Sequence, residues 1–173
     1  MNTIASIIDF KPEFKEKLDV KTSLCTPVDS IPLLDRKNPA KGYEDDVLRY
    51  LIDKKVELGI EQVYRYANSS LDGRVKLKDG RLIDIEVKYR MDWLKACQAS
   101  WQFNHLMKER NDKFGAATNG IVFFEEFSGD WADMEKTHTI EKGWIHWYVD
   151  YYNRGEININ LIQLQNGIIK KHC

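Results

Sequence analysis

The sequence predicts a single α/β (or α+β) domain, residues 1–173, built on a mixed β-sheet. Its 173 residues match the usual length of one domain. Helical and strand patterns alternate in the order helix, three strands, helix, strand, helix, hairpin. Turn signals at Asp79-Gly80 and Asn166-Gly167 separate runs of alternating apolar and polar residues. This interleaving predicts a sheet with helices packed against it.

The composition narrows the class of protein. With 43% hydrophobic and 31% charged residues, the chain has the profile of a folded globular protein. No apolar run approaches the roughly 18 residues that a membrane helix needs, so we expect no membrane partner. Scattered Cys25, Cys97 and Cys173 predict a reducing, cytoplasmic compartment without a disulfide framework. The net charge of −1 excludes a strongly basic nucleic-acid binder but allows a local basic patch.

The first 37 residues have the least regular pattern. They show weak periodicity and hold three of the four prolines. We therefore expect an irregular N-terminal arm, residues 1–37, attached to a core of residues 38–172. The apolar side chains of the arm would pack on the core or on a partner.

A long helix is predicted directly after this arm. Asn38 is a favourable N-cap, Pro39 is a favourable first helical residue, and Gly59 is a favourable stop. The residues between them carry an apolar stripe at helical spacing. Glu44 lies at the edge of this stripe, where it could face a site. The helix dipole also favours acidic residues so early in a helix, which is the alternative explanation.

The remaining elements follow in order. We expect a strand at 62–67, a hairpin at 69–90, a helix at 92–113, a strand at 121–124, a helix near 140–154 and a hairpin at 157–172. The last helix is rich in aromatic residues. Its spacing favours burial or a partner interface, with stacking on nucleic-acid bases as the alternative.

The turn of the first hairpin determines which of its residues face each other. A two-residue loop at Asp79-Gly80 would mix apolar and polar residues on each face, which the burial of one face forbids. A three-residue loop, residues 78–80, with Gly80 in a left-handed conformation keeps the faces separate. In that register Arg74 lies opposite Asp84 as a cross-strand ion pair.

The same register brings two carboxylates together. Asp72 falls directly opposite Glu86, with side-chain roots roughly 5 Å apart, and like charges so placed destabilise a sheet. A divalent cation between them would turn repulsion into attraction, because hard cations prefer oxygen ligands. Lys88 lies two residues further along the same face. A solvated polar strand face is the simpler alternative, and the register favours the metal site over it.

These residues resemble the PD-(D/E)XK nuclease superfamily. The resemblance rests on Leu71-Asp72-Gly73, on Ile85-Glu86-Val87-Lys88 in the next strand, and on an upstream helix that carries Glu44. It covers about residues 39–124 and departs from the motif's name at Leu71, which stands in place of the proline. It implies a restriction-endonuclease-like αβββαβ core, with a mixed central sheet flanked by helices.

The resemblance also implies a role for each residue. Asp72 and Glu86, with the backbone carbonyl of Val87, would bind Mg²⁺, for which Mn²⁺ is expected to substitute. Glu44 would join this shell directly or through water. Lys88 would position or deprotonate the attacking water, or neutralise charge that develops on the phosphate.

The helix after the lysine strand carries two glutamines that could assist Lys88. Many members of the superfamily place a glutamine there. Gln98 and Gln102 share one helical face, and Gln98 is preferred because it is nearer to Lys88 along the chain. For both residues, the solvated face of a helix is the alternative.

Basic residues concentrate around the hairpin. Arg74, Lys76 and Arg90 would contact a phosphate backbone, which requires such positive charge for affinity. Lysines and arginines on strands also serve solubility, so this prediction depends on their closeness to the proposed site.

These expectations combine into a Mg²⁺-dependent deoxyribonuclease that hydrolyses phosphodiester bonds. It would act on DNA as a homodimer or as a subunit of a larger repair, restriction or phage complex. The alternative is a catalytically inactive protein of the same fold that binds nucleic acid or assembles with partners. The chain has no Walker A motif and therefore no ATP-driven motor of its own.

Overall fold

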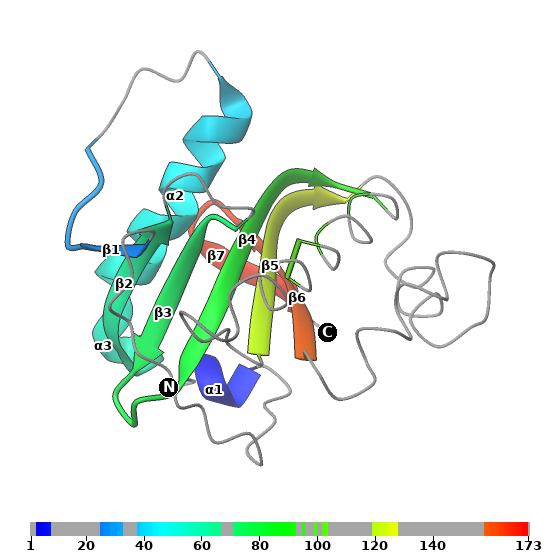
Figure 1. Cartoon of the computed structure of the whole chain (residues 1–173). Coiled ribbons are helices and arrows are strands. Elements are labelled where there is room, and N and C mark those ends of the chain that lie inside the picture. The colour runs from blue at the N-terminus through cyan, green and yellow to red at the C-terminus, as the bar shows by residue number, and fades with distance from the viewer. Residues whose placement is uncertain are drawn as a thin grey trace.

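The computed structural model describes residues 3–7, 25–32, 38–66, 71–92, 95, 99, 102–103, 119–127 and 158–172. These residues form a seven-stranded sheet whose strands follow chain order from β1 to β7 (Figure 1). The strands are β1 (Cys25–Val28), β2 (Ile60–Tyr66), β3 (Gly73–Leu77), β4 (Leu82–Met91), β5 (Asn119–Phe127), β6 (Asn158–Gln165) and β7 (Ile168–His172). Pairing is parallel between β4 and β5 and between β5 and β6, and antiparallel elsewhere. The predicted mixed α/β class is therefore confirmed.

The first long helix begins where the sequence predicts. Asn38 Oδ1 accepts hydrogen bonds from the N–H groups of Ala40 at 3.1 Å and Lys41 at 3.4 Å, which caps α2 (Pro39–Asp53). The helical path is interrupted at Lys54 and continues as α3 (Lys55–Leu58). Gly59 then ends it with a φ of 76°, a left-handed conformation that glycine adopts without strain. One predicted helix is thus two in the structure.

One face of the sheet is apolar and lies under α2. Leu48 of α2 packs with Val75 of β3 and Ile85 of β4 in a single buried cluster. Gly73 permits this close approach, because a Cβ there would lie 2.9 Å from a backbone carbonyl of β2 and 3.1 Å from Leu48. Helix packing therefore explains why a glycine follows Asp72.

The opposite face carries a second buried cluster. Ala99 and Phe103, both helical, pack with Val122 and Phe124 of β5. The ring of Phe103 lies on Gly120, where an added Cβ would be only 2.6 Å away from it. These helical residues belong to the helix predicted over 92–113, of which the structure describes only a part.

The N-terminal arm is more regular than the sequence predicts. Cys25–Val28 form β1, which pairs antiparallel with β2. Ile4, in the short α1 (Ile4–Ile7), is buried in the cluster under α2. Pro27 hides this strand in the sequence, yet proline is tolerated in edge strands such as β1. The sheet and core therefore extend across the predicted boundary at residue 38.

The final hairpin agrees with its prediction. β6 and β7 are joined by Asn166 and Gly167, whose φ angles of 53° and 71° are both positive. That is the backbone of a type I′ turn, for which Asn-Gly is the preferred sequence. β5 is longer than the predicted strand at 121–124. The helix predicted near 140–154 lies outside the described residues.

Candidate active site

The hairpin of β3 and β4 has the register predicted from its turn. The loop comprises residues 78–80, and Gly80 has a φ of 91°. The Leu77 N–H donates to the Arg81 carbonyl at 2.8 Å across this loop. Arg74 lies opposite Asp84, as the three-residue loop requires.

Asp72 is fixed at three points between β2 and β4. Its N–H donates to the Ile85 carbonyl at 3.1 Å, and its own carbonyl accepts from the Tyr66 N–H at 3.0 Å. Its side-chain Oδ2 accepts from the Val87 N–H at 2.8 Å. The backbone therefore aims the Asp72 carboxylate at the middle of β4, next to Glu86.

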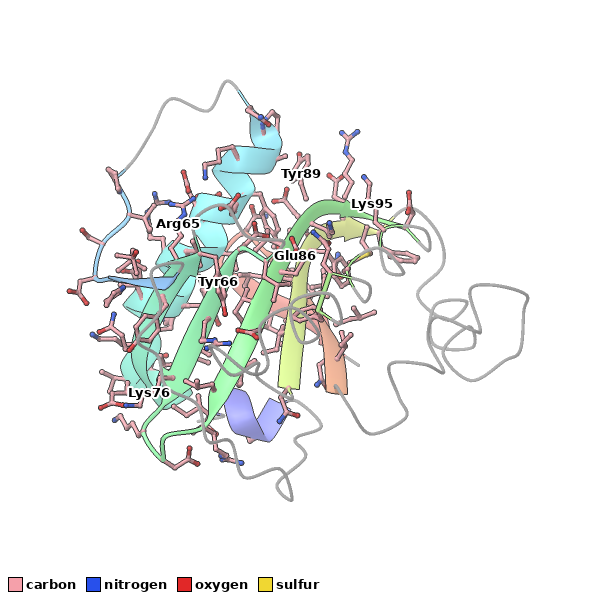
Figure 2. All side chains as sticks on the ribbon, in the orientation of Figure 1. Arg65, Tyr66, Lys76, Glu86, Tyr89 and Lys95 are labelled. Atoms are coloured by element: carbon pink, nitrogen blue, oxygen red, sulfur yellow. The ribbon has the colours of Figure 1, made fainter. Side chains whose placement is uncertain are left out.

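Glu86 is almost completely buried, with 3% of its surface exposed, near the middle of the sheet (Figure 2). Its Oε1 accepts from the Val87 N–H at 3.2 Å. Its Oε2 has no hydrogen-bond partner among the described residues. Burial, and next the neighbouring Asp72 carboxylate, raise the pKa of Glu86 far above its ordinary value of 4.5.

This carboxylate pair fits a divalent cation. The buried Glu86 lies beside the half-buried Asp72, the pKa of Glu86 is raised so that it keeps its proton, and its Oε2 has no hydrogen-bond partner among the described residues. A cation such as Mg²⁺ would take the place of the proton and satisfy the free oxygen, while water completed its shell. Among the described residues no group of three or more acidic, His or Cys side chains gathers, so Asp72 and Glu86 would be the only side-chain ligands there.

The Val87 N–H is a feature that the sequence prediction missed. It donates to both carboxylates, whereas the prediction assigned a role only to the Val87 carbonyl. The cause is a difference in strand length, since β3 has five residues and β4 has ten. The pairing of β4 with β3 does not extend to Val87. The Asp72 side chain therefore accepts the hydrogen bond from the Val87 N–H that a backbone carbonyl of β3 would otherwise accept. The unequal lengths of the two strand patterns are the signal that could have revealed it.

Lys88 lies beside this pair. Its Nζ is 3.9 Å from Glu86 Oε1 and donates to Gln102 Oε1 at 2.9 Å. Gln102 therefore holds the lysine, and Gln98, the preferred candidate, lies outside the described residues. The prediction for Gln98 stays a prediction. A helix that links two parallel strands runs back along the first of them, which can bring a residue as distant in sequence as Gln102 to Lys88.

Glu44 is not brought to the carboxylate pair. Its Oε1 accepts from Arg65 at 2.9 Å and from Lys41 at 3.3 Å. Arg65 also donates to Asp45, which is 4% exposed, at 2.7 Å. Arg65 of β2 thus forms an ion pair with Glu44 of α2, the carboxylate that was predicted to join the metal ligands.

The three basic residues predicted to contact DNA have different surroundings. Arg74 is 2% exposed and bound to Asp84 with an Nε–Oδ1 distance of 2.7 Å, which contradicts its predicted role because a phosphate cannot reach it. Lys76 pairs with Glu61 at 3.3 Å, near the turn of the hairpin and away from Glu86 (Figure 2). Arg90, with a 68% exposed side chain, is accessible.

Comparisons with protein-family models, with curated proteins and with solved structures found no match. A function must therefore be inferred from the geometry of Asp72, Glu86 and Lys88. Within the described ranges, no helix combines the length and the apolar character needed to span a bilayer.

Proposed function

We propose that the chain is a metal-dependent nuclease of the restriction-endonuclease-like class that hydrolyses phosphodiester bonds of DNA. The observation that carries this proposal is the pairing of the buried Glu86 with the half-buried Asp72, in which Glu86 Oε2 has no hydrogen-bond partner among the described residues. Buried polar groups are nearly always satisfied, and strongly perturbed acids concentrate at functional sites. A chain that needed only stability would have replaced one of these acids.

The residues would divide the work as follows. Asp72 and Glu86 would hold Mg²⁺ or Mn²⁺, with the Val87 N–H keeping both carboxylates in place. The metal ion would polarise the phosphate and lower the pKa of a bound water. Lys88, oriented by Gln102, would bring its ammonium to the phosphate and stabilise the negative charge that develops there.

The order of elements supports the proposed class. α2, then β2, β3 and β4, then the helical residues 95, 99, 102 and 103, then β5 follow one another as in an αβββαβ core. The two acids and the lysine lie on the β3–β4 hairpin and its extension, in the middle of the sheet. β1, β6 and β7 extend that core on both sides.

A cleavage assay tests the proposal. Linear, circular, single-stranded and branched DNA would each be incubated with the protein in Mg²⁺, in Mn²⁺ and in EDTA. We expect metal-dependent cutting that falls at least about 100-fold in Asp72→Asn and Glu86→Gln, because metal affinity depends on these groups. Glu61→Gln, which alters an exposed acid paired with Lys76, is the matched control and should cut normally.

Two outcomes would reject the enzyme. Either no DNA is cut in any metal, or Asp72→Asn and Glu86→Gln cut as well as the wild type. Calorimetry with Mn²⁺ then separates the alternatives, because a nucleic-acid-binding or assembly protein without catalytic chemistry should give no metal-binding heat that depends on Asp72.

A further inference from the structure

A cavity of about 460 Å³ lies between the start of α2 and the end of β4. Its size is within the range of about 300–1,000 Å³ typical of ligand pockets. The described residues that line it are Asn38, Pro39, Ala40, Val87, Lys88, Tyr89, Arg90 and Lys95. Three of these are basic and none is acidic, so the cavity favours an anionic occupant.

Lys88 connects the cavity with the carboxylate pair, although neither Asp72 nor Glu86 lines the cavity. Lys88 lines it, and the same lysine has its Nζ 3.9 Å from Glu86 Oε1. Figure 2 shows Tyr89 and Lys95 at the same end of β4, beyond Glu86. A chain of phosphates that reached Glu86 could therefore continue into the cavity.

Two cations in the cavity are available to an anion. Lys95 is held by its backbone N–H, which donates to Asp92 Oδ1 at 2.8 Å, while its ammonium has no partner within the described part of the chain. Arg90 pairs with Glu126 at 3.4 Å, with side chains that are 68% and 50% exposed. Such exposed pairs contribute little stability, so a phosphate could replace Glu126 at small cost.

The helix start does not supply this anion site. Asn38 Oδ1 already accepts from the N–H groups of Ala40 and Lys41, which are the donors that a helix N-terminus would offer. The positive side chains of Arg90 and Lys95, and not the α2 terminus, must therefore bind any anion that enters.

We propose that this cavity holds the phosphate backbone of the nucleic-acid strand next to the bond that is cut. Arg90 and Lys95 contact the flanking phosphates, and Lys88 lies between them and the carboxylate pair. This inference rests on the proposed nuclease function. Of the three basic residues that the sequence assigns to DNA, it keeps Arg90, and it adds Lys95 in place of Lys76, which lies near the turn of the hairpin.

The test measures binding without cleavage. Fluorescence anisotropy of labelled single-stranded and duplex oligonucleotides would be recorded in EDTA over a range of salt concentrations. We expect Lys95→Ala and Arg90→Ala each to weaken binding similarly across sequences and to lower the salt slope by about 1, as the loss of one phosphate contact does. The matched control Lys76→Ala should bind like the wild type.

Four results would overturn the cavity as the strand site. The first two are that the wild type does not bind the oligonucleotide at low salt, or that the Arg90→Ala/Lys95→Ala double variant binds it as tightly as the wild type. The other two are that Lys76→Ala loses as much affinity as Arg90→Ala or Lys95→Ala, or that inorganic phosphate displaces the oligonucleotide at equal phosphate concentration. Binding in EDTA is independent of the chemistry. A protein that binds through the cavity but never cuts would refute only the proposed function, and one that cuts but binds elsewhere would refute only the cavity.

Discussion

Two cross-strand pairs, called rungs below, lie on one face of the β3–β4 hairpin and its extension. One pair neutralises its buried charge and the other does not. On one rung, Arg74 and Asp84 carry opposite charges, and Tyr66 adds a hydrogen bond to Asp84 Oδ1 at 3.0 Å. On the second, two acids, Asp72 and Glu86, lie side by side with the pKa of Glu86 raised, and Glu86 Oε2 has no hydrogen-bond partner in the described structure. The two rungs are two residues apart along each strand. In the first, called the complete rung, the acid has a cationic partner, and in the second, called the incomplete rung, one carboxyl oxygen has no hydrogen-bond partner in the described structure.

The difference shows how a sheet can support a reactive site. Both rungs lie on the face opposite α2, where Arg74, Asp84 and Glu86 are buried and Asp72 is half-buried. The Arg74–Asp84 rung meets the cost of burial within the chain, since each charge has its partner. The Asp72–Glu86 rung has no such counter-charge within the rung, and a bound metal ion would supply one. Substitutions that alter one rung at a time can separate the two effects.

The largest effect is expected from breaking the complete rung. Arg74→Met removes the guanidinium and leaves Asp84 buried without its counter-charge, which should lower the free energy of unfolding by about 3–5 kcal/mol. Urea denaturation monitored by circular dichroism measures it. The Arg74→Met/Asp84→Leu double variant is the control, because replacing both charges by apolar groups should restore most of the loss. A double variant as unstable as the single one would show that the pair is not the cause.

A change at the incomplete rung is expected to have the opposite sign. Glu86→Gln removes a buried carboxyl whose Oε2 has no hydrogen-bond partner in the described structure, so in EDTA the variant should be more stable than the wild type by about 1–3 kcal/mol at neutral pH. Thermal unfolding in Mn²⁺ should reverse this order, because the metal stabilises only the chain that binds it. A destabilised Glu86→Gln in EDTA would contradict the description of this pair.

The pH dependence of that gain follows from the raised pKa of Glu86. The folded chain keeps a proton on Glu86 that the unfolded chain releases above its ordinary pKa of 4.5. This contribution to wild-type stability is fully present below pH 4.5 and is lost as the pH rises toward the raised pKa. The stability gap between Glu86→Gln and wild type should therefore be small near pH 4 and grow toward neutral pH. A gap that stays constant from pH 4 to 8 would contradict the raised pKa.

Features governed by short stretches of chain could be predicted from the sequence. The cap at Asn38, the stop at Gly59 and the turn at Asn166-Gly167 depend on local backbone preferences. The register of the β3–β4 hairpin follows from loop length and face parity, both of which are local. Because that register places Asp72 next to Glu86, the centre of the candidate site was predictable as well.

Features governed by distant partners could not be predicted in this way. Glu44 lies on α2 where the resemblance predicts a metal ligand, but Arg65 of β2 binds its carboxylate. Gln102 holds Lys88 across 14 residues of sequence, a contact that the spacing of the two glutamines does not show. A basic residue such as Arg74 looks the same in sequence whether it is buried or exposed. Long-range side-chain partners therefore decided which predicted site residues came together.

The smallest effect is expected at Tyr66, which connects the two rungs. Its N–H donates to the Asp72 carbonyl, and its hydroxyl donates to Asp84 Oδ1. Tyr66→Phe removes only the hydroxyl, and Arg74 still binds Asp84, so the free energy of unfolding should fall by only about 1 kcal/mol. Because the backbone bond to Asp72 remains, Mn²⁺ affinity measured by calorimetry should stay within a factor of about 3 of the wild type, which is about 0.65 kcal/mol. A larger loss of affinity would mean that the Tyr66–Asp84 hydrogen bond helps to position Asp72 and Glu86. The Arg74–Asp84 and Asp72–Glu86 pairs would then act as a single unit.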